Sequence, residues 1–217
     1  IVKATHCFKT KRPIGDSMER EDELILTFWG YHGTLAENAK KIKQEKDFKC
    51  KHNPYHWLGN GVYFFIDDPD KAIWWAKQAN AKKHKKQQIA YIRCYIQLLK
   101  KELLNLDIER DRLRIDKFFK DFHNTKVICQ DDSKSPEKYR TRVLDFFIKR
   151  GAYKAVKYTF SNTKITYENI NYDISPESDL YLRNNDCQLA VFEQSVIDFS
   201  ELRIYEITES LGEVYYE

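Results

Sequence analysis

Hydrophobic and polar positions along the chain follow patterns that predict strands before and after a helical middle region. Residues 24–31 are mostly β-branched, aromatic or leucine, which is typical of a buried strand. In residues 89–98 apolar side chains occupy every second position, which predicts a strand with one buried face. Shorter apolar segments predict further strands, over residues 62–66, 153–160, 188–192 and 202–207.

Two helices are predicted in the first half of the chain. The first begins after a strand that ends at residues 32–34, where Thr34 precedes Glu37 by the spacing of a capping box. Apolar residues then recur at helical intervals, so a helix of about three turns is expected. Asp68 followed by Pro69 is typical of an N-cap with proline in the first turn, and it predicts the start of the second helix.

Two more helices are predicted in the middle of the chain, over residues 108–122 and 136–150. The second has Ser135 as its N-cap and Gly151 as its stop. Together with the predicted strands, these helices indicate an α+β fold with helices near the N-terminus and in the middle.

The composition, together with the absence of repeats and linkers, indicates one domain. The chain has 217 residues, of which 42% are hydrophobic and 14% aromatic, and this is enough for a sizeable core and excludes disorder over most of the chain. No fixed repeat and no linker rich in proline, glycine or serine divides it. We therefore interpret residues 1–217 as a single domain, with residues 1–23 as a candidate N-terminal extension.

The apolar runs and the cysteines indicate a cellular setting. The longest apolar runs fall far short of the roughly 20 residues that cross a bilayer, so a soluble globular protein without membrane contact is expected. The five cysteines are an odd number, are widely scattered and form no C-x-x-C pair. This favours reduced thiols in a cytoplasm over a framework of disulfides.

Charge is informative through its distribution. The formal net charge of +4 is too small for a protein that coats nucleic acid. Residues Lys77 to Lys86, however, contain five lysines and a histidine with no acid. Two interpretations stay open for this segment: a solvated helix face, or a contact to phosphate or nucleic acid.

Glycines and tryptophans gather in one part of the chain. Four of the seven glycines lie between Gly30 and Gly61, and all four tryptophans lie between Trp29 and Trp75. Glycine lets a backbone approach a ligand closely, and flat rings offer the ligand a stacking surface. A ligand site is therefore predicted in this region, with Trp29 and Trp75 as core residues.

Three fragments of the chain carry recognisable motifs. They are His32-Gly33-Thr34, then the run Gly59-Asn60-Gly61-Val62-Tyr63-Phe64-Phe65, and finally the run Gln188-Leu189-Ala190-Val191-Phe192. In this order and spacing they resemble the ADP-ribosyltransferase superfamily, in the branch of diphtheria toxin and the poly(ADP-ribose) polymerases, whose signature is His, Tyr and Glu. The resemblance spans most of the chain and implies a split antiparallel β-sheet core.

The resemblance also implies residue roles, with NAD as substrate. Tyr63 would stack on the flat, cationic nicotinamide, and Trp74 aligns with the second stacking aromatic. Gly33 would offer its backbone to the carboxamide, and His32 would bind a ribose hydroxyl. The catalytic set is then His32, Tyr63 and Gln188, and the NAD-binding residues are His32, Gly33, Thr34, Gly61, Tyr63 and Trp74.

The sequence departs from the family at two positions. Where the branch has its catalytic Glu, this chain has Gln188, which keeps a hydrogen bond but lacks the charge. Glu193 is the nearest acid that follows Gln188 along the chain, but it faces away from Gln188 on a regular strand. Lys71 stands where the polymerases usually have a serine, and we expect its side chain to turn outward or toward the pyrophosphate.

Metal binding is not expected. Cys50, His52 and His56 have ligand-like spacing, but no fourth ligand accompanies them. A segment of this kind beside the predicted pocket is better interpreted as part of its lid.

The function expected from these features is NAD-dependent transfer of a single ADP-ribose unit to a macromolecule, with release of nicotinamide. The acceptor stays open between protein and nucleic acid, and the Lys77 to Lys86 segment favours nucleic acid slightly. A compact catalytic domain of this type resembles toxin or defence effectors of bacteria or phage, which act in a cytoplasm and can have an antitoxin or inhibitor partner. The alternative, supported by Gln188, is a catalytically silent module of the same fold that binds NAD, nucleic acid or a partner.

Overall fold

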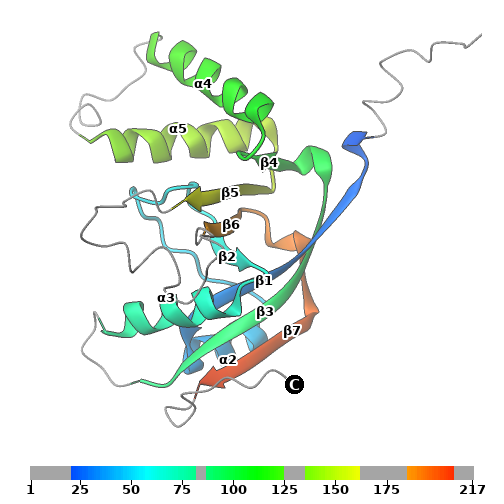
Figure 1. Ribbon diagram of the computed structural model, residues 1–217, viewed down its shortest axis with the longest axis vertical. Helices are drawn as coiled ribbons and strands as arrows, with labels where there is room; N and C mark the ends of the chain where they lie inside the picture. The colour runs from blue at the N-terminus through cyan, green and yellow to red at the C-terminus, as the bar shows by residue number, and fades with distance from the viewer. Residues whose placement is uncertain (1–20, 82–86, 125–134, 162–184, 208–217) are drawn as a thin grey trace, which may run out of the picture.

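The computed structural model describes residues 21–81, 87–124, 135–161 and 185–207, which form one sheet with helices on both faces (Figure 1). Residues 1–20, most of the candidate N-terminal extension, lie outside the described residues, as does 82–86 of the basic segment. The elements follow in the order β1 (Ile25–Leu35), α2 (Ala36–Glu45), β2 (Val62–Ile66), α3 (Pro69–Ala81), β3 (Ile89–Leu99), β4 (Leu103–Asn105), α4 (Glu109–Asn124), α5 (Pro136–Gly151), β5 (Ala155–Ser161), β6 (Asn185–Val191) and β7 (Ile197–Ile207).

The seven described strands form a single sheet in the order β4-β5-β6-β2-β1-β3-β7. The α+β class is therefore confirmed. A wholly antiparallel core is not, because β4 and β5 are parallel while the other neighbours are antiparallel. Parallel neighbours need a long crossover, and α4 and α5 supply it. The hydrophobic pattern does not predict β4, because a strand of three residues is too short for a recognisable alternation.

The longest ladder of the sheet is the pairing of β1 with β3, which runs from Ile25 opposite Leu99 to Leu35 opposite Ile89. The predicted alternation of β3 is confirmed, since its inward residues are almost completely buried: Ala90, Ile92, Cys94, Ile96 and Leu98. The predicted end of β1 at residues 32–34 is wrong, because these residues stay in the ladder with β3. Leu35 is consequently the N-cap of α2, and no side chain caps that helix.

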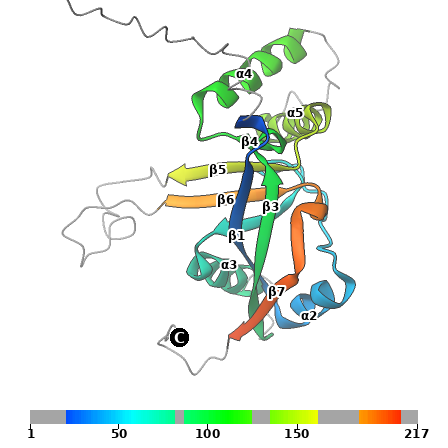
Figure 2. The ribbon, with the colours of Figure 1, turned by 90° about the vertical axis from the view of Figure 1, so that its right-hand side faces the viewer.

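Helices cover the two faces of the sheet unequally (Figure 2). On one face, buried residues of α2 pack with Phe64 of β2 and Ile92 of β3. On the opposite face, Ile73 and Ala76 of α3 pack with Ile89, while buried residues of α4 and α5 pack with the strands β5 and β6. The tyrosine of β2, Tyr63, belongs to this second face. No helix in the described part of the chain is long and apolar enough to cross a membrane.

Local signals for the helix ends are confirmed in two cases. The backbone N–H of Lys71 donates to Asp68 Oδ1 at 2.9 Å, so Asp68 caps α3. Ser135 caps α5 by accepting from the N–H of Lys138. At the other end, α5 continues through Gly151 and reverses at Ala152, whose φ of 53° is left-handed.

The tryptophans are placed differently from the prediction. Trp75 was expected in the core, but 51% of its surface is exposed. The buried positions of α3 are Ala72, Ile73 and Ala76, which face the sheet. Ala72 and Ala76 lie where the helix backbone rests directly on Gly33 of β1, and no bulky side chain fits between the two backbones there.

Candidate functional site

The strands β1 and β2 pair only briefly. Their ladder consists of Gly30 opposite Ile66 and Tyr31 opposite Phe65, extended by a hydrogen bond from the N–H of Asp67 to the carbonyl of Trp29 at 3.0 Å. Beyond Tyr31, β1 continues along β3, whereas the first half of β2 is paired with β6 alone. The sheet is therefore split beside His32 of β1 and Tyr63 of β2.

His32 occupies this split with its side chain. Its Nδ1 lies 2.9 Å from the carbonyl oxygen of Tyr63, and its ring contacts Phe48 and Phe64 at centroid distances of 5.3 and 5.8 Å. A carbonyl can only accept, so Nδ1 carries the proton. Burial lowers the pKa of His32, and the hydrogen bond to the Tyr63 carbonyl opposes this only in part. The neutral imidazole thus keeps Nε2 as an acceptor, suited to a hydroxyl donor.

The ring of Tyr63 is fixed on the other face of the sheet. Its hydroxyl accepts from the N–H of Leu58 at 2.8 Å and donates to the carbonyl of Gly59 at 2.9 Å. Burial raises the pKa of this phenol strongly, so it stays protonated. The ring of His56 lies beside it, with centroids 5.2 Å apart. Both hydrogen bonds orient the Tyr63 ring without the help of a ligand.

The loop of residues 50–61 is anchored to α5. Asp145 accepts from the backbone N–H of Asn60 at 2.7 Å and from its side-chain amide at 2.6 Å. Buried Thr141 donates to the carbonyl of His56 at 2.8 Å. Cys50 lies against the carbonyl of Gly61, and within the described residues no group of three His, Cys, Asp or Glu side chains is placed to hold a metal. This segment is a fixed wall of the site in the structure.

Gln188 and Tyr63 lie on the same face of the sheet. Gln188 is opposite Phe65, and Tyr63 is opposite Ala190, two residues further along β6. Residues two apart on a strand share a face, so the two side chains are diagonal neighbours. Gln188 lies in the middle of β6 and not at its start, because the strand already begins at Asn185.

An acidic residue that the sequence analysis did not select lies on the same face. Asp186 precedes Gln188 by two positions, and its Oδ1 is 2.8 Å from Nζ of Lys71. Glu193, which the sequence analysis did consider, is exposed beyond the end of β6, where its N–H donates to the carbonyl of Lys154. Asp186 is thus the carboxylate that shares a face with Gln188, and its position two residues earlier on the strand is the signal in the sequence that could have identified it.

Helix α3 contributes the remaining residues around the site. Lys71 neither turns into solvent nor lies unpaired, since only 19% of its side chain is exposed and its Nζ is 5.9 Å from the centroid of the Trp74 ring. A Cβ atom on Gly33 would lie 1.8 Å from the carbonyl oxygen of Ala72, so α3 rests on the backbone of β1. Trp74 itself is half exposed.

The predicted residues thus divide between the two faces. Gly33, Tyr63 and Gln188 share the face that α3 covers, where Lys71 pairs with Asp186 and lies beside the ring of Trp74. His32 and Thr34 occupy the alternate positions of β1 and belong to the opposite face. Gly61 lies at the start of β2, where a Cβ would be 2.8 Å from the carbonyl of Val191. The split brings His32 to the backbone of Tyr63 and not to its ring.

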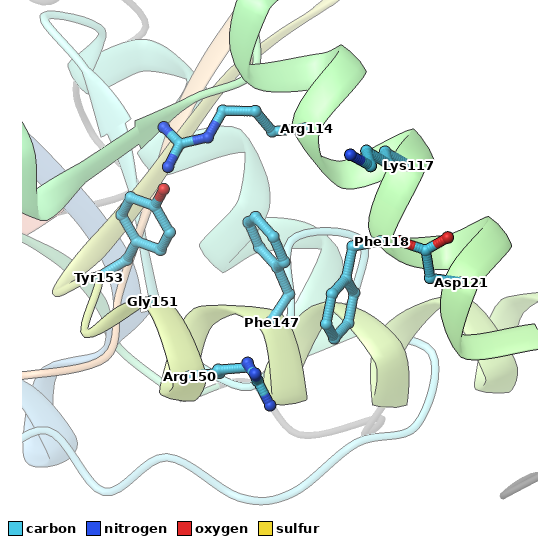
Figure 3. Close-up of a pocket in the computed structure, with 8 residues that line it drawn as sticks. All are labelled: Arg114, Lys117, Phe118, Asp121, Phe147, Arg150, Gly151 and Tyr153. Atoms are coloured by element: carbon cyan, nitrogen blue, oxygen red, sulfur yellow. The ribbon is translucent and has the colours of Figure 1, made fainter. Parts of the chain in front are cut away.

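A separate hollow lies between α4 and α5 (Figure 3). It has a volume of about 390 Å³ and contains none of the predicted site residues. Its lining combines cations with aromatic rings: Arg114, Lys117, Phe118, Asp121, Phe147, Arg150, Gly151 and Tyr153. Arg114 of α4 points toward the hydroxyl of Tyr153, and the ring of Phe118 of α4 contacts that of Phe147 of α5 with centroids 5.0 Å apart, so the lining is largely engaged in joining α4 to α5 and the residues that follow it.

Comparison with known proteins gives one match at the sequence level. The chain is 29% identical over 98 residues to an uncharacterized protein of Methanocaldococcus jannaschii. The alignment covers 45% of this chain and 45% of the relative, so it spans less than half of either protein. No protein-family model matches the chain. No solved structure matches it either.

Proposed function

We propose that the protein is an NAD-dependent mono-ADP-ribosyltransferase, which transfers ADP-ribose to a macromolecular acceptor and releases nicotinamide. The observation that carries the proposal is the split between β1 and β2, which His32 bridges to the backbone of Tyr63, with Gln188 of the neighbouring strand β6 as a diagonal neighbour of Tyr63. The order of the three motifs and the split sheet both agree with the resemblance to the ADP-ribosyltransferase superfamily.

The groups around the split suit the parts of NAD. The ring of Tyr63, held by two hydrogen bonds, would stack on the nicotinamide, and Trp74 would approach it from α3. The backbone of Gly33 would bind the carboxamide. The unprotonated Nε2 of His32 would accept a hydrogen bond from a ribose hydroxyl, which is a binding role and not acid–base chemistry.

In the reaction, the bond from the ribose carbon to the pyridinium nitrogen breaks and its electron pair leaves with nicotinamide. The acceptor then bonds to the ribose carbon and loses a proton. Positive charge develops on the ribose in between, as in glycosidic cleavage. Gln188 can bind a ribose hydroxyl but cannot offset this charge, and Asp186 is the carboxylate that shares its face. We assign the electrostatic role to Asp186 and expect no chain elongation into poly(ADP-ribose).

A bacterial or phage effector, acting in a cytoplasm as a toxin or in defence, remains our proposal for the biological setting. The resemblance to the branch of diphtheria toxin supports this, and an antitoxin or inhibitor partner would accompany such an activity.

One observation favours a catalytically silent module as the second candidate. Lys71 neutralises Asp186, so that no unpaired carboxylate adjoins Gln188 in the described residues. Calorimetric titration with NAD, combined with an assay of nicotinamide release, separates the two candidates. Binding in the micromolar-to-millimolar range together with release supports the enzyme, binding without release supports a silent NAD-binding module, and absence of binding supports a silent relative that no longer binds NAD.

The direct test is incubation of the full chain with NAD labelled in the adenylate part, together with cell extract. Nicotinamide release and transfer of the label to protein or nucleic acid are expected. A Gln188→Glu variant should raise activity or shift it toward chain growth or hydrolysis of NAD. If neither protein releases nicotinamide or transfers label, the enzyme proposal fails.

A further inference from the structure

Two aromatic side chains project from the loop of residues 50–61. Trp57 is 61% exposed and Tyr55 is 52% exposed, although rings of this size are usually covered. The loop adjoins the candidate site, because the N–H of Leu58, the next residue after Trp57, donates to the hydroxyl of Tyr63. Whatever these rings bind would therefore lie beside the split in the sheet.

The rings are held in place by a rigid backbone. Thr141 donates to the carbonyl of His56, between the two aromatic residues. The N–H of Tyr55 donates to Oδ1 of Asn53 at 3.0 Å. Phe160 of β5 packs its ring perpendicular to that of Trp57, with centroids 6.0 Å apart. Exposed rings that are fixed in this way lose little conformational freedom when they bind a partner.

Each ring is paired with a cation from the start of α5. The guanidinium carbon of Arg140 lies 4.5 Å from the centroid of the Trp57 ring. Nζ of Lys138 lies 5.5 Å from the centroid of the Tyr55 ring. The surface thus repeats one unit twice, a partly exposed ring next to a positive charge. We call these four residues the ring–cation surface.

Arg140 has unused hydrogen-bond donors. Its Nε and Nη2 are buried and have no hydrogen-bond partner in the part of the chain that the structure describes. The neighbouring acids are engaged elsewhere, since Glu137 accepts from the hydroxyl of Ser135 and Asp145 holds Asn60. Buried guanidinium donors without partners are costly, and an oxygen of a phosphate would satisfy them.

Arg140 also connects this surface to the candidate site. Its charge acts on Tyr63 and partly opposes the rise in the pKa of the phenol that burial causes. A ligand phosphate held by Arg140 would accordingly lie close to the residue proposed to stack on nicotinamide.

We infer that the ring–cation surface binds single-stranded nucleic acid, with bases stacked on Trp57 and Tyr55 and phosphates bound by Arg140 and Lys138. Alternating flat rings and cations fit a chain of alternating bases and phosphates, and such stacking tolerates any base. That the bound nucleic acid is also the acceptor of ADP-ribose rests on the proposed function. Binding of nucleic acid by this surface does not depend on that function.

The test measures binding without any chemistry. Fluorescence anisotropy of a labelled mixed-sequence 12-nucleotide RNA, and of the same sequence as DNA, is recorded with the full chain at about 50 mM salt, and again at about 200 mM. Binding should weaken as salt rises, since phosphate contacts release counterions. Trp57→Ala should weaken binding about tenfold or more, the range expected for one stacked base. Arg140→Gln should weaken binding and reduce its dependence on salt.

Matched controls exist for both changes. Trp75 is 51% exposed on α3, and Lys149 is exposed on the other end of α5. Trp75→Ala and Lys149→Gln should bind as the unmodified protein does. Circular dichroism and thermal melting confirm that each variant is folded. If neither oligonucleotide binds, or if the control variants lose as much affinity as the test variants, the inference is overturned.

Nicotinamide release without oligonucleotide is measured on the same proteins. Oligonucleotide binding without nicotinamide release would contradict the enzyme proposal and support nucleic-acid binding by the ring–cation surface. Nicotinamide release with transfer of label to protein, but without oligonucleotide binding, would support the enzyme proposal and contradict nucleic-acid binding by this surface.

Discussion

Lys71 on α3 and Asp186 on β6 form an ion pair, with Nζ 2.8 Å from Oδ1 and each side chain about one-fifth exposed. The pair joins the first turn of the helix to the strand that carries Gln188. Its carboxylate lies on the same face of the sheet as Gln188 and Tyr63, where the proposed reaction needs negative charge.

Replacing Asp186 by asparagine should therefore lower the rate of nicotinamide release. Loss of one electrostatic element of this kind costs about 10²–10³ in rate. The affinity for NAD, measured by calorimetry, should change much less. Glu193→Gln serves as the control, since this acid is exposed beyond the end of β6 and should leave the rate unchanged. An Asp186→Asn variant with full activity would remove Asp186 from the proposed reaction.

Replacing Tyr63 by phenylalanine should destabilise the protein by about 1–3 kcal/mol, because both hydrogen bonds between its hydroxyl and the loop are lost. Urea denaturation measures this change. Tyr205→Phe, at a half-exposed position of β7, should cost less than about 0.5 kcal/mol. Equal stability of the two variants would mean that the hydroxyl of Tyr63 does not hold the loop.

Replacing Asp145 by alanine should free the loop from α5. Asn60 then loses both of its hydrogen bonds to the carboxylate, and limited proteolysis should cut within residues 50–61 several times faster. Asp116→Ala, at an exposed position of α4, is the matched control. Unchanged cleavage in the Asp145 variant would show that other contacts suffice to hold the loop.

Replacing Gly33 by alanine should be among the most destabilising changes in β1. The new Cβ would lie 1.8 Å from the backbone oxygen of Ala72, so α3 must shift, and the loss should reach the upper end of the ~1–3 kcal/mol that overpacking costs. Gly30→Ala should cost less, because its nearest neighbour is the movable end of the Ile96 side chain. Thermal melting of the two variants tests this order, and the reverse order would contradict the packing of α3 on β1.

Stability should fall as the pH is lowered from about 7 to 5, in part through His32. Burial depresses its pKa from the ordinary 6.5, so in this range the unfolded chain binds a proton that the folded chain does not. Stability is therefore fully present above the ordinary pKa and is lost as the pH falls below it. In His32→Gln this loss should be smaller, as measured by urea denaturation at several pH values. His56, whose pKa burial also lowers, contributes in the same direction, and the exposed His52 supplies the control variant His52→Gln. The same pH dependence in all variants would contradict a buried neutral His32.

Local hydrogen bonds and alternation explain which parts of the fold could be predicted. Asp68 and Ser135 cap their helices through contacts within three residues, and the inward residues of β3 alternate without exception. The end of β1 was mispredicted because Thr34 satisfies local rules for a helix start, yet pairing with β3 holds it in the sheet. Trp75 was mispredicted because helical periodicity does not say which residues fit against a close-packed backbone.

The amino-acid sequence alone was enough to define the α+β class, most element positions and the three motifs that suggest NAD chemistry, because these depend on neighbours in the chain. Only the tertiary structure decided that Gln188 shares a face with Tyr63, that His32 reaches the Tyr63 carbonyl through a split in the sheet, and that Asp186 meets Lys71. These relationships join residues that are far apart in the sequence, so they arise from strand register and helix packing and have no local signature.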